Sequence, residues 1–158
     1  QKGIPFCGAS GRLLDKLLLS IKLDRKEVFI GNVVKHRAPG NRDPLPEEIE
    51  ACRPFLDEQI ELIDPEIIVT LGRFSMNKFL PGEKISQVHG QARFVKFAGK
   101  KRIVIPMYHP AAALRRGSIM EEVKKDFLKI RQFLEGDSEV IEEEKKSENK
   151  EEQLSLIN

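Results

Sequence analysis

Three side chains of this sequence have the chemistry to bind a flat, polar ring and stabilise charge that develops on it. His109 follows an apolar run at 103–107 and precedes Pro110, which restricts the backbone of His109 to an extended shape. A rigidly held imidazole can donate a hydrogen bond to a developing anion. The amide of Asn32 offers donors and an acceptor to a complementary base edge, and the Phe6 ring can stack on a base. Taken alone, each of the three residues is more commonly structural.

Basic and apolar residues in predicted loops could add contacts to a polyanion. Arg37, Arg42, Arg115 and Arg116 all lie in such loops, where arginine suits phosphate groups. Leu114, just before the Arg pair, could wedge into a base stack or simply pack in the core. Charge alone leaves both interpretations open.

Alternating apolar strands and amphipathic helices must position these residues. The patterns predict an α/β fold, because short continuous apolar runs are typical of strands buried in a mainly parallel sheet. Ligands of such sheets bind beyond the carboxyl ends of the strands, where Asn32, Gly72 and His109 are found. We expect helices over 9–20, 46–63, 73–80 and 118–134, and strands over 28–34, 67–71, 92–97 and 102–107.

Composition indicates one globular domain followed by an acidic tail. The chain has 158 residues, of which 40% are hydrophobic and 33% charged. Residues 137–158 contain eight acidic and three basic side chains, which leaves +7 on residues 1–136 and favours a polyanionic partner for that domain. No apolar run reaches the length of a membrane span, and two cysteines favour a reducing, cytoplasmic location. The opening residues read like the middle of a loop, so we expect the natural chain to begin upstream.

Five segments, in order, resemble the family 4 type of the uracil-DNA glycosylase superfamily. They include Gly-Ile-Pro-Phe-Cys-Gly from residue 3, Asn-Val-Val-Lys from residue 32 and Tyr-His-Pro-Ala-Ala from residue 108. The other matches are 51–56 and 68–73, and the likeness runs from residue 3 to about residue 134.

The resemblance implies a DNA repair enzyme that flips uracil out of DNA and hydrolyses its N-glycosidic bond. It implies a three-layer sandwich with a central four-stranded, mainly parallel sheet. Phe6 would stack on the uracil, Asn32 would read its edge, and His109 would stabilise negative charge on its O2. Leu114, Arg115 and Arg116 would wedge into the duplex and hold its phosphates, with Arg37 and Arg42 as further DNA contacts.

Two departures from the family pattern affect these expectations. An acidic motif that handles water should precede residue 3, so we expect this fragment to be weakly active or inactive. The family typically binds a [4Fe–4S] cluster through four cysteines, of which Cys52 matches one and His36 replaces another. The sequence leaves open both a cluster with three Cys and one His ligand and the loss of the cluster. Cys7 is expected to be a packed small residue, and His89 is given no role.

The tail ends in a hexamer that is similar to sliding-clamp-binding peptides of bacterial repair proteins. Leu154, Leu156 and Ile157 would fill an apolar groove, and Gln153 would fix the register. The rest of the tail is expected to be disordered, since it is charged and poor in aromatic residues.

Two alternatives to the repair enzyme remain. One is a non-catalytic relative that binds DNA or uracil-containing DNA without cleaving it. The protein is expected to be a monomer in either case. The other is an unrelated nucleotide-binding enzyme, which is disfavoured because no glycine-rich phosphate loop follows Ile30 or Leu71.

Overall fold

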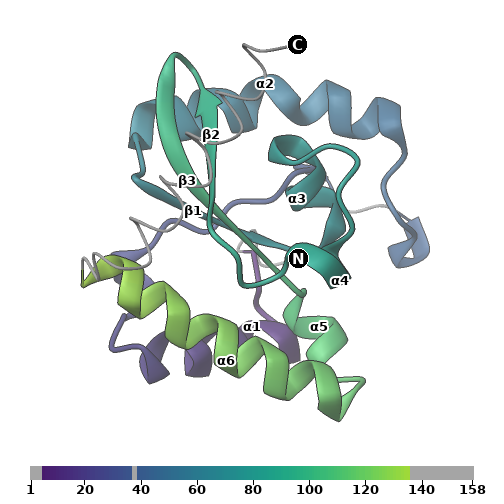
Figure 1. Cartoon of the computed structure of the whole chain (residues 1–158). Helices are drawn as coiled ribbons and strands as arrows, with labels where there is room; N and C mark the ends of the chain where they lie inside the picture. Colours follow the sequence, from purple (N-terminus) through teal and green to yellow (C-terminus); the bar gives the residue numbers. More distant parts are fainter. Residues whose placement is uncertain (1–4, 37–38, 136–158) are drawn as a thin grey trace, which may run out of the picture.

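The computed structural model describes residues 5–36 and 39–135 (Figure 1). Six helices and three strands are assigned in this part of the chain, with 3₁₀ turns at Arg25–Glu27 and Pro39–Asn41. The helices are α1 (Ala9–Ser20), α2 (Pro46–Ile63), α3 (Arg73–Phe79), α4 (Ile85–Val88), α5 (Pro110–Ala113) and α6 (Gly117–Leu134). The strands are β1 (Ile67–Leu71), β2 (Arg93–Phe97) and β3 (Lys100–Met107). The predictions for the acidic tail concern residues outside the described ranges.

The sheet has three strands in the order β1-β3-β2 and is mixed rather than mainly parallel. β1 runs parallel to β3, with Ile67 opposite Ile103 and Leu71 opposite Met107. β2 pairs antiparallel with β3, because both strands flank the tight turn at Ala98 and Gly99. The expectation of four strands is therefore not met in the described part of the chain.

The expected strand over 28–34 is wrong for the described structure. Val28 and Ile30 pack against the core, but the Phe29 side chain is 56% exposed and the chain bends from Val33 to His36. The backbone N–H of Lys35 donates to the thiol of Cys52 instead of to a neighbouring strand. The β-branched run thus packs by its side chains without forming a ladder.

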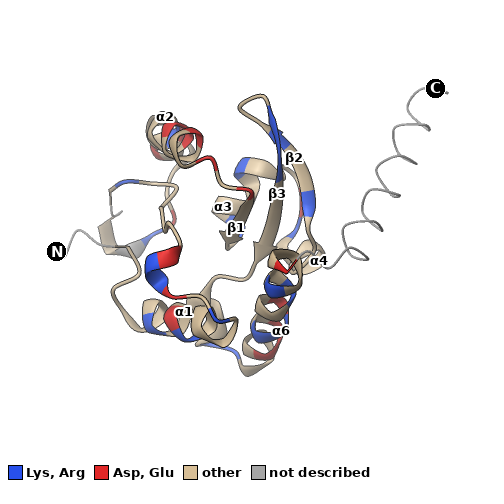
Figure 2. Cartoon of the chain, turned by 90° about the vertical axis from the view of Figure 1, so that its left-hand side faces the viewer, with Lys and Arg blue, Asp and Glu red and all other residues tan. Residues whose placement is uncertain are grey.

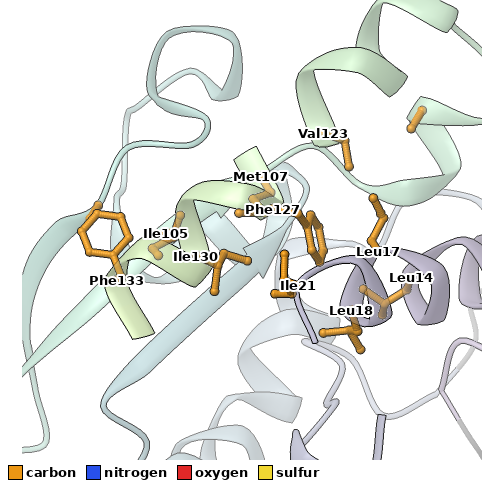
Figure 3. Close-up of a cluster of buried hydrophobic side chains, with 12 residues drawn as sticks. Leu14, Leu17, Leu18, Ile21, Ile105, Met107, Val123, Phe127, Ile130 and Phe133 are labelled. Atoms are coloured by element: carbon orange, nitrogen blue, oxygen red, sulfur yellow. The ribbon is translucent and has the colours of Figure 1, made fainter. Parts of the chain in front are cut away.

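Helices cover both faces of the sheet, which gives three layers. Successive residues of a strand point to opposite faces. Ile105 and Met107 of β3 join a core formed with α1 and α6 (Figure 3), while Val104 packs with Ile60 of α2 and Phe79 of α3. In Figure 1, α1 and α6 lie below the sheet and α2 lies above it.

The ends of α2 follow the sequence signals. Pro46 occupies the first turn, where its missing N–H is not needed, and the Glu48 carboxylate accepts a hydrogen bond of 2.8 Å from the Leu45 N–H. The helix ends at Asp64, whose φ of 51° is left-handed. α6 also matches expectation within one residue, and its inner face contains Val123, Phe127 and Ile130.

Candidate active site

Two parallel strand ends bring Gly72 and His109 together. Because Leu71 and Met107 are in register, the residues that follow them lie side by side, and the Gly72 N–H donates to the Met107 carbonyl at 2.8 Å. A Cβ atom on Gly72 would lie 3.1 Å from the His109 Cβ, and the Gly72 φ of +88° is in the left-handed region. Glycine at position 72 therefore leaves the space that the His109 side chain uses.

The imidazole of His109 is held in one tautomer. His109 caps α5, and its Nδ1 accepts a hydrogen bond of 3.0 Å from the Ala111 N–H. Burial lowers the pKa of His109, so the ring is neutral at neutral pH. A neutral imidazole whose Nδ1 accepts must carry its proton on Nε2. His109 consequently presents one N–H donor without a positive charge.

The Phe6 ring stacks on His109 with their centroids 5.3 Å apart and their planes at 20°. Phe6 has a left-handed φ of 56°, and a Cβ on Gly11 would lie 1.6 Å from the Phe6 carbonyl oxygen. The Arg25 guanidinium donates to the Pro5 carbonyl at 2.7 Å and to Asp15 at 2.8 Å. The loop that carries Phe6 is therefore fixed both to the start of α1 and to the turn that follows it.

Asn32 is exposed, and no hydrogen bond in the described ranges joins it to His109. Its backbone carbonyl accepts a hydrogen bond of 3.1 Å from Lys35 Nζ, which also donates to Gln59 Oε1 at 2.6 Å. Within the described residues, no hydrogen bond occupies the Asn32 side-chain amide. The structure thus joins two of the three predicted site residues and leaves the third available to a ligand.

An open groove of about 310 Å³ lies between α2 and α3, and its lining includes Val33, the residue after Asn32. Val33, Pro44, Ile49, Leu56 and Phe74 line it. The groove is distinct from the ring pair, which lies at the strand ends.

The loop after His109 presents the predicted wedge and its arginines. The side chain of Leu114 is 48% exposed, although it directly follows the helix α5. Arg115 and Arg116 are exposed before α6 begins. In the ribbon of Figure 2, the blue positions of Lys and Arg are spread over several elements and are not gathered at one loop.

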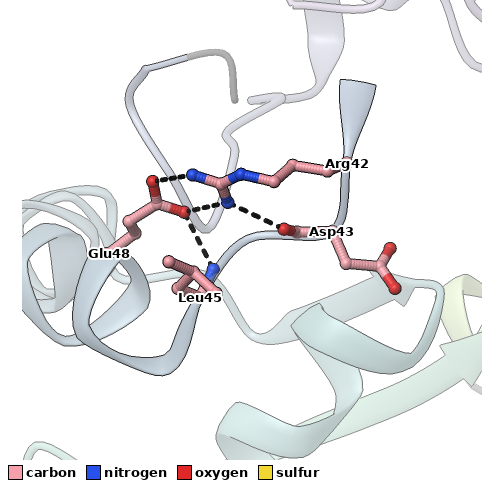
Figure 4. A network of polar contacts seen from close by, with 4 residues as sticks. All are labelled: Arg42, Asp43, Leu45 and Glu48. Carbon is pink, nitrogen blue, oxygen red and sulfur yellow. Dashed lines mark hydrogen bonds and ion pairs between the residues drawn. The ribbon is translucent and has the colours of Figure 1, made fainter. Parts of the chain in front are cut away.

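Arg42 is committed to a contact within the fold. Its guanidinium binds both carboxylate oxygens of Glu48, at 2.8 and 2.7 Å, and donates to the Asp43 carbonyl (Figure 4). The hydrogen bonds from Arg42, followed by that from Leu45, lower the pKa of Glu48 to about 2. Arg42 therefore carries little unpaired charge for a phosphate. Arg37 lies outside the described residues.

The described residues do not make a complete metal site. They contain no group of three or more His, Cys, Asp or Glu side chains placed to hold a metal ion. Cys52 is buried and accepts the Lys35 N–H at 3.3 Å, whereas His36 and Cys7 are exposed. Exposed Cys7 is not the packed residue that the sequence suggested. Cys52 and His36 could supply at most two of the four ligands of a cluster.

A polar pair beside Tyr108, formed by Asp126 and His89, was missed from the sequence. Asp126 of α6 is 2% exposed and lies 2.8 Å from His89 Nδ1, and the His89 ring lies 4.7 Å from that of Tyr108. A Cβ on Gly90 would come within 2.0 Å of the Asp126 carboxylate. The sequence does contain a sign of this pair, because Asp126 lies on the apolar face of α6 between Val123 and Ile130, and a buried carboxylate needs a partner.

The fold and this arrangement at the strand ends define a class of protein. The family model described as the uracil DNA glycosylase superfamily matches residues 1–135, so the chain belongs to that superfamily. Within it, the chain is similar to the type-4 uracil-DNA glycosylase of Archaeoglobus fulgidus, with 50% identity over 134 residues, 82% of this chain and 67% of the relative. It is 47% identical over 139 residues to the type-4 enzyme of Sulfurisphaera tokodaii, covering 84% of this chain and 63% of the relative.

The likeness extends to two further relatives, one of them of another kind. The type-4 uracil-DNA glycosylase of Thermotoga maritima is 41% identical over 131 residues, which is 79% of this chain and 68% of that enzyme. A DNA polymerase of Bacillus phage SP01 is 32% identical over 130 residues, which is 82% of this chain and 14% of the polymerase. The chain thus spans about two thirds of the length of the type-4 relatives. No helix in the described ranges is long and apolar enough to cross a membrane.

Proposed function

We propose that this chain is the core of a uracil-DNA glycosylase that begins base excision repair. The observation that carries the proposal is the neutral His109 with its proton on Nε2, beside the Phe6 ring, in a member of this superfamily. In the reaction, the bond between the sugar C1′ and uracil N1 breaks, and its electron pair leaves with the base. Water supplies a hydroxyl group to C1′ and a proton to the base, which leaves an abasic site.

His109 would stabilise the leaving uracil by donating its Nε2 proton as a hydrogen bond to O2. A neutral donor suits this task because it lowers the energy of the developing anion without transferring its own proton. The Ala111 N–H, through Nδ1, keeps the ring turned in this direction. A fixed donor needs no reorganisation at the moment the bond breaks.

Phe6 and Asn32 would recognise the flipped base. Stacking on an aromatic ring is worth about 1–3 kcal/mol per base. The side-chain amide of Asn32 would pair with the pyrimidine edge, which carries an acceptor and a donor side by side. Because Phe6 now stacks on His109, the base would enter along the edge of this pair or displace the Phe6 ring.

The loop after His109 would hold the DNA. Leu114 would occupy the gap that the flipped nucleotide leaves, and Arg115 and Arg116 would contact flanking phosphates. Arg37 remains a candidate contact, and Arg42 could contribute only beside its pair with Glu48.

Cys52 and His36 are proposed as two ligands of a [4Fe–4S] cluster, with the others outside the described residues. The N–H donated to Cys52 Sγ is the kind of outer contact that orients a ligand of a metal centre. Iron and sulfide analysis of the full-length protein tests this, since about four irons per chain are expected. A colourless, iron-free protein purified without oxygen would refute it.

The tail is proposed to be a separate segment that binds the sliding clamp through Gln153, Leu154, Leu156 and Ile157. Residues 1–136 would form the catalytic domain of a cytoplasmic, nucleoid-associated, monomeric enzyme. Deleting residues 153–158 should abolish clamp pull-down and leave cleavage of short oligonucleotides intact.

The proposed activity is tested with the full-length protein and two oligonucleotides that differ only in one uracil or thymine. Incubation followed by alkali should break the uracil strand at that position and leave the thymine strand whole. Binding of the uracil strand without breakage would instead favour a non-catalytic relative, for which the Phe6 ring covering His109 is the supporting observation. Neither binding nor breakage would contradict both functions.

A further inference from the structure

Lys35 is the residue that fastens the Asn32 bend to the rest of the fold. Its Nζ donates to the Asn32 carbonyl at 3.1 Å and to Gln59 Oε1 at 2.6 Å. Its backbone N–H donates to Cys52 Sγ at 3.3 Å. Gln59 and Cys52 both belong to α2, so one lysine joins the exposed Asn32 to a long helix.

The sheet does not provide this support. In the described chain, residues 28–34 form no ladder with β1, β2 or β3. Asn32 itself is exposed, and the chain bends immediately after it. The direction of its side chain must therefore depend on contacts made by its neighbours.

The hydrogen bond from Lys35 Nζ to the Asn32 carbonyl influences the direction of the Asn32 side chain through the backbone. A hydrogen bond to this oxygen fixes the peptide plane between Asn32 and Val33, and so limits ψ of Asn32. The bond is charge-assisted, which makes it stronger than one between neutral groups. Gln59 fixes the position of Nζ in turn, because its oxygen is the nearer of the two acceptors.

We propose that Lys35 is a positioning residue for base recognition, which holds Asn32 against α2 through the Asn32 carbonyl and Gln59. This inference rests on the proposed function, in which Asn32 reads the edge of uracil. Two of the three N–H donors of the Lys35 ammonium serve these protein acceptors, so its proposed role is to hold Asn32 and not to contact the base.

A double-mutant cycle in the full-length protein tests this coupling. Single-turnover cleavage of a uracil oligonucleotide is measured for the wild type, Lys35→Met, Asn32→Ala and the double variant. A misplaced recognition group can cost about a hundredfold in rate, so Lys35→Met should lose about tenfold to a hundredfold. In the Asn32→Ala background the same change should cost less than about twofold, because its target is gone.

Three controls separate positioning from other roles of a lysine. Lys124→Met removes an exposed lysine that pairs with Glu121 on α6, and it should leave the rate unchanged. The salt dependence of DNA binding should be the same for Lys35→Met and the wild type, whereas loss of a phosphate contact would reduce the slope by about one. If Lys35→Met does not fold, Gln59→Leu replaces it in the cycle and should show a smaller loss with the same dependence on Asn32.

Failure of the proposed role of Lys35 can be distinguished from failure of the proposed glycosylase activity. An equal loss in both backgrounds, or a reduced salt slope, would overturn the positioning role while uracil cleavage stands. If the wild type binds uracil-containing DNA without cleaving it, the proposed activity fails. The same cycle is then measured on affinity, where coupling supports the inference and additivity overturns it.

Discussion

The backbone N–H of Ala111 donates a hydrogen bond of 3.0 Å to Nδ1 of His109, two residues earlier. This contact arises because His109 caps the short helix α5, with Pro110 at the first helical position. The same contact that closes the helix end thereby places the imidazole proton on Nε2. The His109 side chain therefore both caps α5 and presents the N–H donor of the site.

The lowered pKa of His109 predicts how cleavage depends on pH. Burial favours the neutral ring, so the rate should rise as pH increases through a pKa that lies below the ordinary value of 6.5, and then become level. Single-turnover rates between about pH 5 and 8 measure this. A rate that falls as pH rises through 6.5 would indicate that the charged imidazolium is the active form.

The same shift has a consequence for stability. The unfolded chain binds a proton at His109 more readily than the folded chain does, so His109 lowers the free energy of unfolding as pH falls below 6.5. In His109→Gln, the free energy of unfolding measured with urea should depend less on pH below 6.5 than it does in the wild type. An unchanged profile would contradict the assignment of a neutral ring.

Gly72→Ala should reduce cleavage by displacing His109. The added Cβ would meet the His109 Cβ at 3.1 Å, on a backbone with φ of +88°. Gly82→Ala is a matched control, because Gly82 has φ of +85° but a Cβ added there would meet nothing within 4 Å. Both variants should lose roughly 1–2 kcal/mol of stability, and only Gly72→Ala should also lose about tenfold or more in rate. Equal rates for the two variants would argue against close packing of Gly72 on His109.

Asp126→Ala should destabilise the fold. Asp126 is 2% exposed and its carboxylate lies 2.8 Å from His89, so its removal leaves a half-buried ring nitrogen unpaired. We expect a loss of about 1–3 kcal/mol in the free energy of unfolding, measured with urea. Glu121→Ala, which breaks only the exposed pair with Lys124, should stay within about 0.5 kcal/mol of the wild type. Similar losses for both variants would show that the buried pair contributes little.

The pair of Arg42 and Glu48 predicts acid sensitivity. The pKa of Glu48 is about 2, against an ordinary value of 4.5, so the pair contributes its stability above pH 4.5 and loses it as pH falls toward 2. The free energies of unfolding of the wild type and Arg42→Met should therefore differ at neutral pH and converge in acid. Arg53→Met, which removes an exposed partner of Glu50, is the control. A difference that does not change with pH would contradict this origin.

The sequence predicted the parts of this fold that depend on local signals. Pro46 and the Asp64-Pro65 pair delimit α2, and the apolar runs of β1 and β3 place Gly72 and His109 at strand ends. The contact between Phe6 and His109 joins residues far apart in the chain, which only the resemblance suggested.

The remaining features depend on tertiary contacts that no local pattern specifies. Val28 and Ile30 look like strand residues, yet Lys35 bonds to α2 and the chain bends instead of extending a ladder. Asp126 falls on the apolar face of α6, but the sequence does not show that His89, 37 residues earlier, is its partner. Arg42 reads as a free loop cation, although Glu48 is six residues away and binds it at both oxygens.

The most direct test of this account compares the full-length wild type with His109→Ala on one uracil-containing duplex. Single-turnover cleavage and affinity for the uncleaved duplex are measured side by side. Loss of one fixed donor to the leaving uracil should slow cleavage by about 10²–10³ while the affinity stays within about twofold. Cleavage by His109→Ala at the wild-type rate would contradict the role of this imidazole and, with it, the site as it is described.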